Sequence, residues 1–330
     1  MNAVKKKNSI GDFISKNVML CILLIMVVVL AIVADGFLSV GNLLGILRSV
    51  AITGVIAFGM TMVIIAGEID LSVGSTIGLS GVIVAKTAGS LDAAGIMPME
   101  TAVIVGMVFA LLLGAVIGYL VGKIRTRFNI PTFIITLAML NALYGIAAII
   151  SNGFPVTTVP TWYGFIGAGT LGSIPVPAIW LLLVFIISLI LMNYTRFGRE
   201  IYAVGGNPES ARLSGINVSK IKISVMVIVQ VLAAFAGIIL SSQVYSGSAS
   251  FGRGYEMDVI APVIIGGASL NGGMGKITGT LVGIVFLGIL LNGMTLLGVD
   301  DYVKYVVRGM VILLAVLVNA IQDEIAKKKQ

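Results

Sequence analysis

Long apolar runs separated by short polar loops constrain the fold of this chain most strongly. The runs recur along most of the sequence, from 18–34 to 303–320. Their lengths suit an α-helix that crosses a bilayer, which needs ~20 residues. Lipid offers no hydrogen bonds to an exposed backbone, so such runs fold as helices that satisfy their own backbone groups. Hydrophobic residues make up 58% of the chain and charged residues 11%, which excludes an ordinary soluble domain. The sequence therefore predicts an all-α, polytopic membrane protein.

The positions of Lys and Arg predict how these runs are threaded. Most of the 21 basic residues lie at the two ends of the chain and in alternate short loops, as expected on the cytoplasmic side of a membrane. This distribution predicts about ten transmembrane helices, with both termini in the cytoplasm. It also accounts for the net charge of +7 without a nucleic-acid partner. The predicted domains are a cytoplasmic N-terminal tail at 1–16, a single transmembrane domain at 17–322 and a cytoplasmic basic tail at 323–330.

The longest of the basic loops, at 195–222, is patterned like a folded element. Asn207 is suited to cap a helix, and Pro208 stands where the first helical residue would be. Glu209 follows at the positive end of the helix dipole, and Gly215 is placed to end the helix. The pattern predicts a short helix in a cytoplasmic loop.

The use of that helix has two interpretations. A capped helix on the cytoplasmic side is suited to binding a soluble partner, with Gly205 and Gly206 allowing a tight turn before it. The alternative is a solvated loop whose basic residues only set the topology. The pattern alone supports both interpretations about equally.

Two acidic residues stand at the end of the second apolar run. Glu68 and Asp70 lie in the segment AGEIDLSVGS at 66–75, and an apolar run resumes at Val73. Carboxylates at i and i+2 do not share a helix face, so the segment predicts a sharp turn at the inner surface or a broken helix. A gate or a partner contact is the functional interpretation. We favour two solvated acids in a turn, because no nucleophile or metal ligand converges on them.

Glycine-rich patterns indicate how the helices pack and repeat. Gly114, Gly118 and Gly122 recur at every fourth position, which predicts a small-residue stripe for close helix contact. The segments IIAG at 64–67 and IIGG at 264–267 each close an apolar run before an inner turn. Transporters are often built from structural repeats, of which this similarity is a weak sign.

One apolar run carries a stripe of polar side chains. At helical spacing it presents Thr132, Thr136, Asn141 and Tyr144. Polar residues on a membrane helix line a pathway or make helix–helix contacts, and the sequence does not distinguish the two.

The sequence offers little for catalysis or cofactor binding. It has no histidine, which removes His-based metal sites and Ser-His-Asp triads, and its one cysteine, Cys21, precludes an intrachain disulfide. The glycine-rich segment near Lys276 fails the phosphate-loop pattern, because Leu270 and Ile277 stand where Gly and Ser or Thr are required. We expect no catalytic residue, cofactor or metal in this chain.

Four segments together resemble a known family. They are GEIDLSVGS at 67–75, IPTFIITLAML at 130–140, TRFGREIYAVGGNPESARLSGINVSKIK at 195–222 and YEMDVIAPVIIGGASLNGGMGKITGTLVG at 255–283. In this order they resemble the permease subunits of bacterial ribose-type ABC importers. The resemblance implies a pore of two permease subunits, identical or closely related, in the plasma (inner) membrane. It also implies a cytoplasmic ATP-binding subunit that hydrolyses ATP, and an extracytoplasmic protein that delivers a monosaccharide.

The resemblance assigns a role to the loop at 195–222. In that family the GGN…ARLSGI segment is the coupling element that docks on the ATPase. The matching residues are Gly205, Gly206, Asn207, Ala211, Arg212, Leu213, Gly215 and Ile216.

The motifs do not name the sugar, since relatives that import ribose, other pentoses, hexoses and related ligands share them. Asn141, Tyr144 and Asn292 are candidates to bind a sugar along the pathway, or are polar packing residues. The alternative class is an ion-coupled secondary transporter of a small polar solute. It would need ionisable residues at mid-membrane depth, whereas the sequence places Glu68, Asp70 and Asp258 near the surfaces.

Overall fold

The structure, a computed structural model, describes residues 18–328 and, within them, the side chains of 19–317. The predicted tail at 1–16 lies outside these residues. Of the predicted tail at 323–330, residues 323–328 continue the last helix, and 329–330 are outside the described part. The long helices are α2 (Val18–Val33), α3 (Val40–Ile65), α4 (Val73–Ala93), α5 (Met99–Phe128), α6 (Thr132–Ser151), α8 (Val176–Tyr194), α11 (Val218–Gln243), α13 (Ile277–Leu296) and α14 (Asp301–Lys328).

Shorter elements connect them. The short helices are α7 (Phe165–Ala168), α9 (Arg196–Gly206), α10 (Pro208–Leu213), α12 (Tyr255–Ile265) and the 3-10 turns η1 (Thr161–Gly164) and η2 (Ala249–Gly252). Strands β1 (Thr170–Leu171) and β2 (Ile174–Pro175) form a small antiparallel hairpin in which Thr170 pairs with Pro175.

The all-α, polytopic membrane fold is confirmed. Among the described helices, six are long and apolar enough to cross a membrane: α3, α5, α6, α8, α11 and α13. The predicted number of about ten is not reached on this criterion. One reason is length, because α2 has 16 described residues and α12 has 11, short of the ~20 that span a bilayer.

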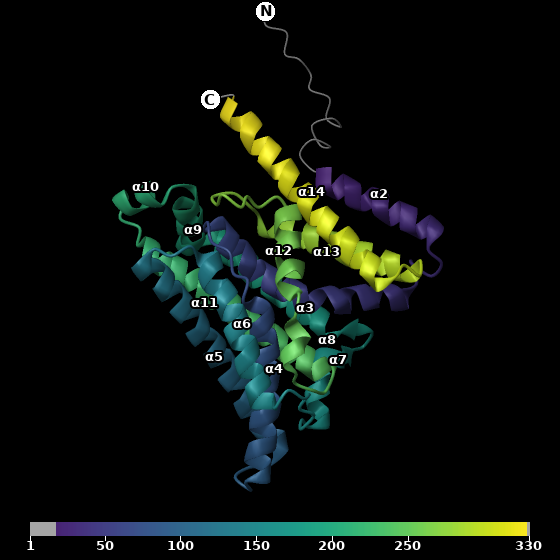
Figure 1. The fold of residues 1–330 in the computed structure, drawn as a ribbon. Coiled ribbons are helices and arrows are strands. Elements are labelled where there is room, and N and C mark those ends of the chain that lie inside the picture. The colour runs from purple at the N-terminus through teal and green to yellow at the C-terminus, as the bar shows by residue number, and fades with distance from the viewer. Residues whose placement is uncertain (1–17, 329–330) are drawn as a thin grey trace, which may run out of the picture.

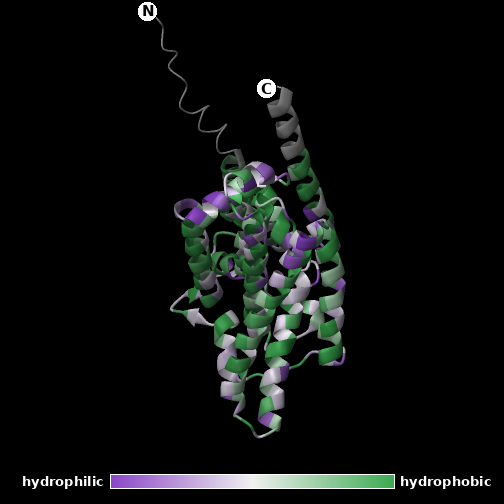
Figure 2. Ribbon diagram, turned by 90° about the vertical axis from the view of Figure 1, so that its left-hand side faces the viewer, coloured by the Kyte–Doolittle hydropathy of each residue, from purple (hydrophilic) through white to green (hydrophobic). Residues whose placement is uncertain are grey.

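The helices pack around α11, which lies against α3, α4 and α5, while α12 and α13 pack against each other and against α3. Figure 1 shows α9 and α10 at the upper end of the molecule, where α2 begins and α14 ends, and the α4–α5 turn at the opposite end. Hydrophobic colour runs along the long helices, and hydrophilic colour gathers at the end that carries α9 and α10 (Figure 2).

The glycine stripe of α5 is a helix-packing surface, as predicted. A Cβ atom at Gly114 would lie 2.8 Å from the Gln230 carbonyl oxygen of α11, and one at Gly122 would lie 2.7 Å from the Ile223 Cα. The backbones of α5 and α11 therefore approach closely because these positions have no side chain.

Replacing Gly118 with alanine tests this contact. The new methyl carbon would lie 2.6 Å from the Val227 Cα, in the middle of the stripe. Overpacking of this kind costs about 1–3 kcal/mol, so we expect a lower melting temperature in detergent. Gly145→Ala in α6 is the matched control, because no atom lies within 4 Å of its new methyl group. Equal melting temperatures for the two variants would contradict the packing role.

The similarity between 64–67 and 264–267 is a repeated helix end. In α3 the amide of Gly67 donates to the Ile64 carbonyl and that of Glu68 to the Val63 carbonyl; α12 has the same pair of bonds two hundred residues later. Gly67 and Gly267 both adopt left-handed backbone angles, φ 76° and 88°, which glycine allows without strain. Both helices therefore stop abruptly and release the chain in a new direction.

Candidate functional site

The predicted capped helix is present as α10. The Asn207 Oδ1 atom accepts hydrogen bonds from the backbone amides of Glu209 and Ser210, each at 3.0 Å, and Pro208 is the first helical residue. These bonds satisfy amides that a helix start leaves free. Gly215 then takes a left-handed conformation with φ 82° just after the helix. The prediction of a short capped helix is confirmed.

One face of α10 is held by the protein and the other is free. Ala211 is buried, whereas Leu213 is 75% exposed. On the same exposed surface Arg212 pairs with Glu209 at 2.6 Å, and this hydrogen bond, reinforced by the charge, lowers the pKa of the Glu209 carboxyl. A cavity of about 450 Å³ beside the loop is lined by residues that include Arg196 and Lys220.

Gly205 and Gly206 do not form the predicted tight turn. Both belong to the last turn of α9, and the chain changes direction at the extended residue Asn207. Gly205 instead allows close approach, because a Cβ atom there would overlap the carbonyl oxygen of Ile65, the last residue of α3. That carbonyl accepts a hydrogen bond from the Gly273 amide at 2.8 Å. The end of helix α9 therefore packs directly against the end of α3.

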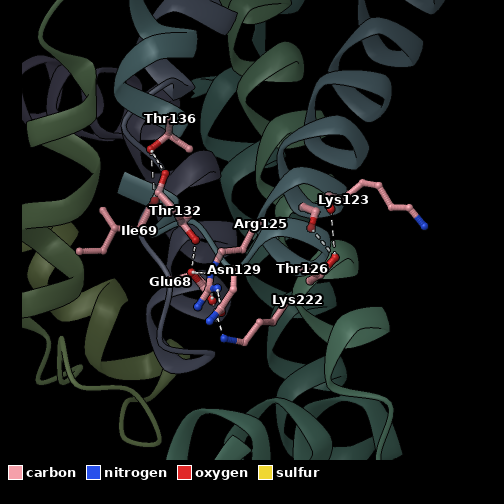
Figure 3. A network of polar contacts seen from close by, with 10 residues as sticks. Glu68, Ile69, Lys123, Arg125, Thr126, Asn129, Thr132, Thr136 and Lys222 are labelled. Atoms are coloured by element: carbon pink, nitrogen blue, oxygen red, sulfur yellow. Dashed lines mark hydrogen bonds and ion pairs between the residues drawn. The ribbon is translucent and has the colours of Figure 1, made fainter. Parts of the chain in front are cut away.

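The solvated-acid interpretation of Glu68 is wrong. The Glu68 carboxylate is buried, with 3% of its side chain exposed, and contacts two cations: Arg125 of α5 at 3.0 Å and Lys222 of α11 at 2.5 Å. Thr132 at the start of α6 also donates a hydrogen bond to it. Figure 3 shows these groups converging on Glu68. One carboxylate thus joins the ends of three membrane helices to the segment after α3.

Asp70 is also buried, and it lies deeper than the sequence predicted. It accepts hydrogen bonds from the Ser72 amide and hydroxyl, at 2.8 and 2.7 Å, and from the Gln230 side-chain amide at 2.7 Å. Gln230 lies at the middle of α11 (Val218–Gln243), so Asp70 is not at a surface turn. The broken-helix alternative is the one observed: α3 ends, an extended segment follows, and α4 begins beside the middle of α11.

The predicted pathway residues separate into two groups. Thr132 and Thr136 are buried and contact the segment after α3: Thr132 donates to the Glu68 carboxylate, and the Thr136 hydroxyl donates to the Ile69 carbonyl at 3.3 Å. Asn141 and Tyr144 line a cavity of about 140 Å³. Asn292 lines a larger cavity of about 620 Å³ and exchanges hydrogen bonds with Asn42 at 2.8 and 3.0 Å.

Asp258, predicted near the outer surface, lies inside the helix bundle. It pairs with Arg308 of α14 at 2.5 Å, and each side chain is about one-fifth exposed. It lines the same cavity as Leu287, which is near the middle of α13 (Ile277–Leu296). The surface location that the sequence suggested for Asp258 is therefore wrong.

Sequence reasoning missed the partners of these acids. In the sequence, Arg125 and Lys222 fit the pattern of cytoplasmic basic residues, and Gln230 and Arg308 lie within apolar runs. For Gln230 and Arg308 the available signal is a single polar residue inside an otherwise apolar run, whereas Arg125 and Lys222 stand at the ends of runs and carry no such signal. Among residues 18–328, no group of three or more His, Cys, Asp or Glu side chains is placed to hold a metal ion.

The fold and these sites define the class of the protein. A bundle of apolar helices with broken segments and polar cavities is typical of membrane transport proteins. Residues 42–316 match the protein family described as "Branched-chain amino acid transport system / permease component". The chain belongs to this permease family, in its ribose-type ABC importer group.

Individual relatives agree with this assignment. The ribose import permease protein RbsC of Bacillus subtilis (strain 168) is 44% identical over 299 residues, 90% of each chain. RbsC of Escherichia coli (strain K12) is 41% identical over 302 residues, 90% of this chain and 91% of the relative. The L-arabinose ABC transporter permease protein AraH of Azospirillum brasilense is 34% identical over 325 residues, 95% and 90% of the two chains. No solved structure gave a significant match.

Proposed function

We propose that this chain forms the translocation pathway of an ATP-driven importer for a monosaccharide, ribose or a related pentose or hexose. The relatives named for ribose and L-arabinose support the substrate class. The proposed partners are a cytoplasmic ATP-binding subunit, a second permease subunit that is identical or a close paralogue, an extracytoplasmic sugar-binding protein and membrane lipid. ATP is hydrolysed in the separate subunit.

The proposed topology has ten crossings, with both termini in the cytoplasm. Ten described helices support it: α2, α3, α4, α5, α6, α8, α11, α12, α13 and α14. An even number returns the chain to its starting side, in keeping with α9, α10, the start of α2 and the end of α14 lying at one end of the molecule (Figure 1). The transmembrane domain at 17–322 then carries one cytoplasmic coupling loop at 195–222.

The observation that carries the proposal is the exposed face of α10. This helix is the proposed docking element for the ATPase, and the coupling residues are Gly205, Gly206, Asn207, Ala211, Arg212, Leu213, Gly215 and Ile216. Movement of α10 passes to α9, because the two are joined at Asn207. It then reaches the end of α3 through the close contact of Gly205 with Ile65.

Beyond that contact, the Glu68 cluster ties the end of α3 to α5, α6 and α11, so a shift of α9 acts on the whole inner half of the bundle. Such a shift changes the transport state only if the ATPase binds the inward-open and outward-open forms with different free energies.

Replacing Leu213 with glutamate tests the docking role. The side chain is 75% exposed, so the permease should fold normally, while a buried apolar contact at a partner interface would be lost. Loss of such a contact costs ~2 kcal/mol or more, and we expect recovery of the co-purified ATPase to fall at least tenfold. Lys123→Gln, exposed on α5 outside the coupling loop, is the control. Full ATPase recovery with Leu213→Glu would contradict the proposal.

An ion-coupled secondary transporter is the second candidate, and the depth of Asp70 and Asp258 in the bundle favours it more than the sequence did. The energy source of uptake distinguishes the two candidates. Uptake that collapses with an uncoupler while ATP is maintained indicates ion coupling, whereas uptake that follows ATP supports the importer.

A further inference from the structure

The half-length helix α12 brings polar groups to the interior of the bundle. Its 11 residues extend about 16 Å, roughly half of the ~30 Å hydrocarbon core. The chain leaves α11 at Gln243 and returns through η2, which packs against the first turns of α4 beside the middle of α11. Helix α12 therefore starts at depth, just after Gly254, rather than at the outer surface.

A cavity of about 620 Å³ opens at this start, between α3, α12, α13 and α14. Its volume is within the ~300–1,000 Å³ typical of small-ligand pockets. The polar side chains of its wall include Ser49, Thr53, Arg253, Asp258, Asn292 and Arg308. Apolar side chains of α3, α12 and α13, among them Val50, Pro262 and Leu287, form much of the remainder.

The Asp258–Arg308 pair is the chemical centre of this cavity. Charged groups within a membrane bundle are costly and usually face a water-filled space, which fits the partial exposure of both side chains. The Arg308 Nε atom is buried and makes no hydrogen bond within the described part of the chain. About one-fifth of each side chain is exposed, so the pair presents carboxylate acceptors and guanidinium donors side by side.

We infer that this cavity is a transient binding site for a neutral polyhydroxylated solute, in which Asp258 and Arg308 hold neighbouring hydroxyl groups. A hydroxyl donates to the carboxylate of Asp258 and the adjacent hydroxyl accepts from the guanidinium of Arg308. Tyr305, whose ring centroid is 5.4 Å from the Arg308 guanidinium carbon, offers a flat face to the C–H side of the solute.

The charge of the wall favours a neutral solute. Asp258 and Arg308 neutralise each other, and the remaining cation, Arg253, lies over the ring of Tyr144, 6.0 Å from its centroid. Arg253 lines this cavity and also the smaller neighbouring one of about 140 Å³, whose wall holds the opposite charge of Glu256. This inference rests on the proposed function, because it assigns the sugar of that function to one cavity.

Site-directed labelling tests occupancy without disturbing the ion pair. Cys21 is the only native cysteine, so Thr53→Cys in a Cys21→Ser background places a single thiol in the cavity wall. In the complete complex, D-ribose or L-arabinose is expected to slow its reaction with a small thiosulfonate reagent at least threefold. Ser90→Cys, exposed on α4 away from the cavity, is the control and should react at one rate with or without sugar.

Transport by two further variants gives an independent readout. Asp258→Asn and Arg308→Gln should each raise the sugar concentration for half-maximal uptake about tenfold, because each loses a charge-assisted hydrogen bond. Lys304→Gln, one turn away on α14 and paired with Asp301, should leave uptake unchanged.

The outcomes separate this inference from the proposed function. ATP-dependent uptake by the unaltered complex without protection of Thr53→Cys overturns the site alone. Protection by inorganic phosphate but not by the sugars also overturns it, and assigns the cavity to an anion. Absence of ATP-dependent sugar uptake by the unaltered complex overturns the proposed function and this inference together.

Discussion

Replacing Glu68 with glutamine is expected to destabilise this permease by roughly 3–5 kcal/mol, the usual cost of removing one partner from a buried ion pair. The substitution leaves the cations of Arg125 and Lys222 without their shared carboxylate, and neither is well exposed to solvent. Because the two cations stand on α5 and α11, their repulsion acts between helices that are packed through the glycine stripe. We expect a clear fall in melting temperature in detergent, and reduced coupling of ATP hydrolysis to uptake.

The control for this prediction is Glu209→Gln, the same chemical change in a fully exposed pair with Arg212. Exposed pairs contribute little to stability, so its melting temperature should equal that of the unaltered chain. A double variant, Glu68→Gln with Arg125→Gln, removes one unpaired cation and should be more stable than the sum of the single effects predicts. Unchanged melting of Glu68→Gln would show that the cluster does not hold the helices together.

Replacing Gly205 with alanine is also expected to have a large effect, on both stability and coupling. The new methyl group would overlap the Ile65 carbonyl oxygen and come within 2.7 Å of the Gly273 amide nitrogen, both of which are backbone atoms. The backbone must shift to accept it, at a cost of about 1–3 kcal/mol, and the hydrogen bond from Gly273 to Ile65 is strained. We expect a lower melting temperature, together with ATP hydrolysis that no longer drives uptake.

Gly206→Ala is the matched control at the adjacent position. It stands at the end of the same helix, and no atom lies within 4 Å of its added methyl group. Alanine favours a helix over glycine by up to ~1 kcal/mol, so stability should be equal or slightly higher. If both variants melt alike, close contact between α9 and the end of α3 is not the reason for glycine at 205.

Some of these features were readable along the chain because their causes are local. The spans follow from hydropathy over about 20 residues, and the glycine stripe of α5 follows from a four-residue repeat. The capped helix α10 follows from Asn207 and Pro208, whose hydrogen bonds and backbone angle act within three residues. For such features, sequence neighbours are also neighbours in space.

The partners of the charged residues could not be predicted from the sequence, because they are distant along the chain. Lys222 and Glu68 are 154 positions apart in the sequence, and Gln230 and Asp70 are 160 apart. A loop cation and a cation that neutralises a buried carboxylate look the same in a sequence, so the sequence does not distinguish these two roles for Arg125. The depth of Asp70 and Asp258 in the bundle is hidden in the sequence for a related reason. Both stand beside apolar runs, but an extended segment carries Asp70 into the bundle, and the return through η2 does the same for Asp258.

The sequence by itself thus determined the class of fold, the capped helix and the closely packed glycine face. Hydropathy, caps and helical periodicity depend on residues a few positions apart. Only the tertiary structure decided that Glu68 joins α5, α6 and α11, that Gly205 seats α9 on α3, and that Asp258 faces Arg308 across a cavity. These are contacts between helices distant in the chain, and helix packing rather than sequence spacing sets which side chains meet.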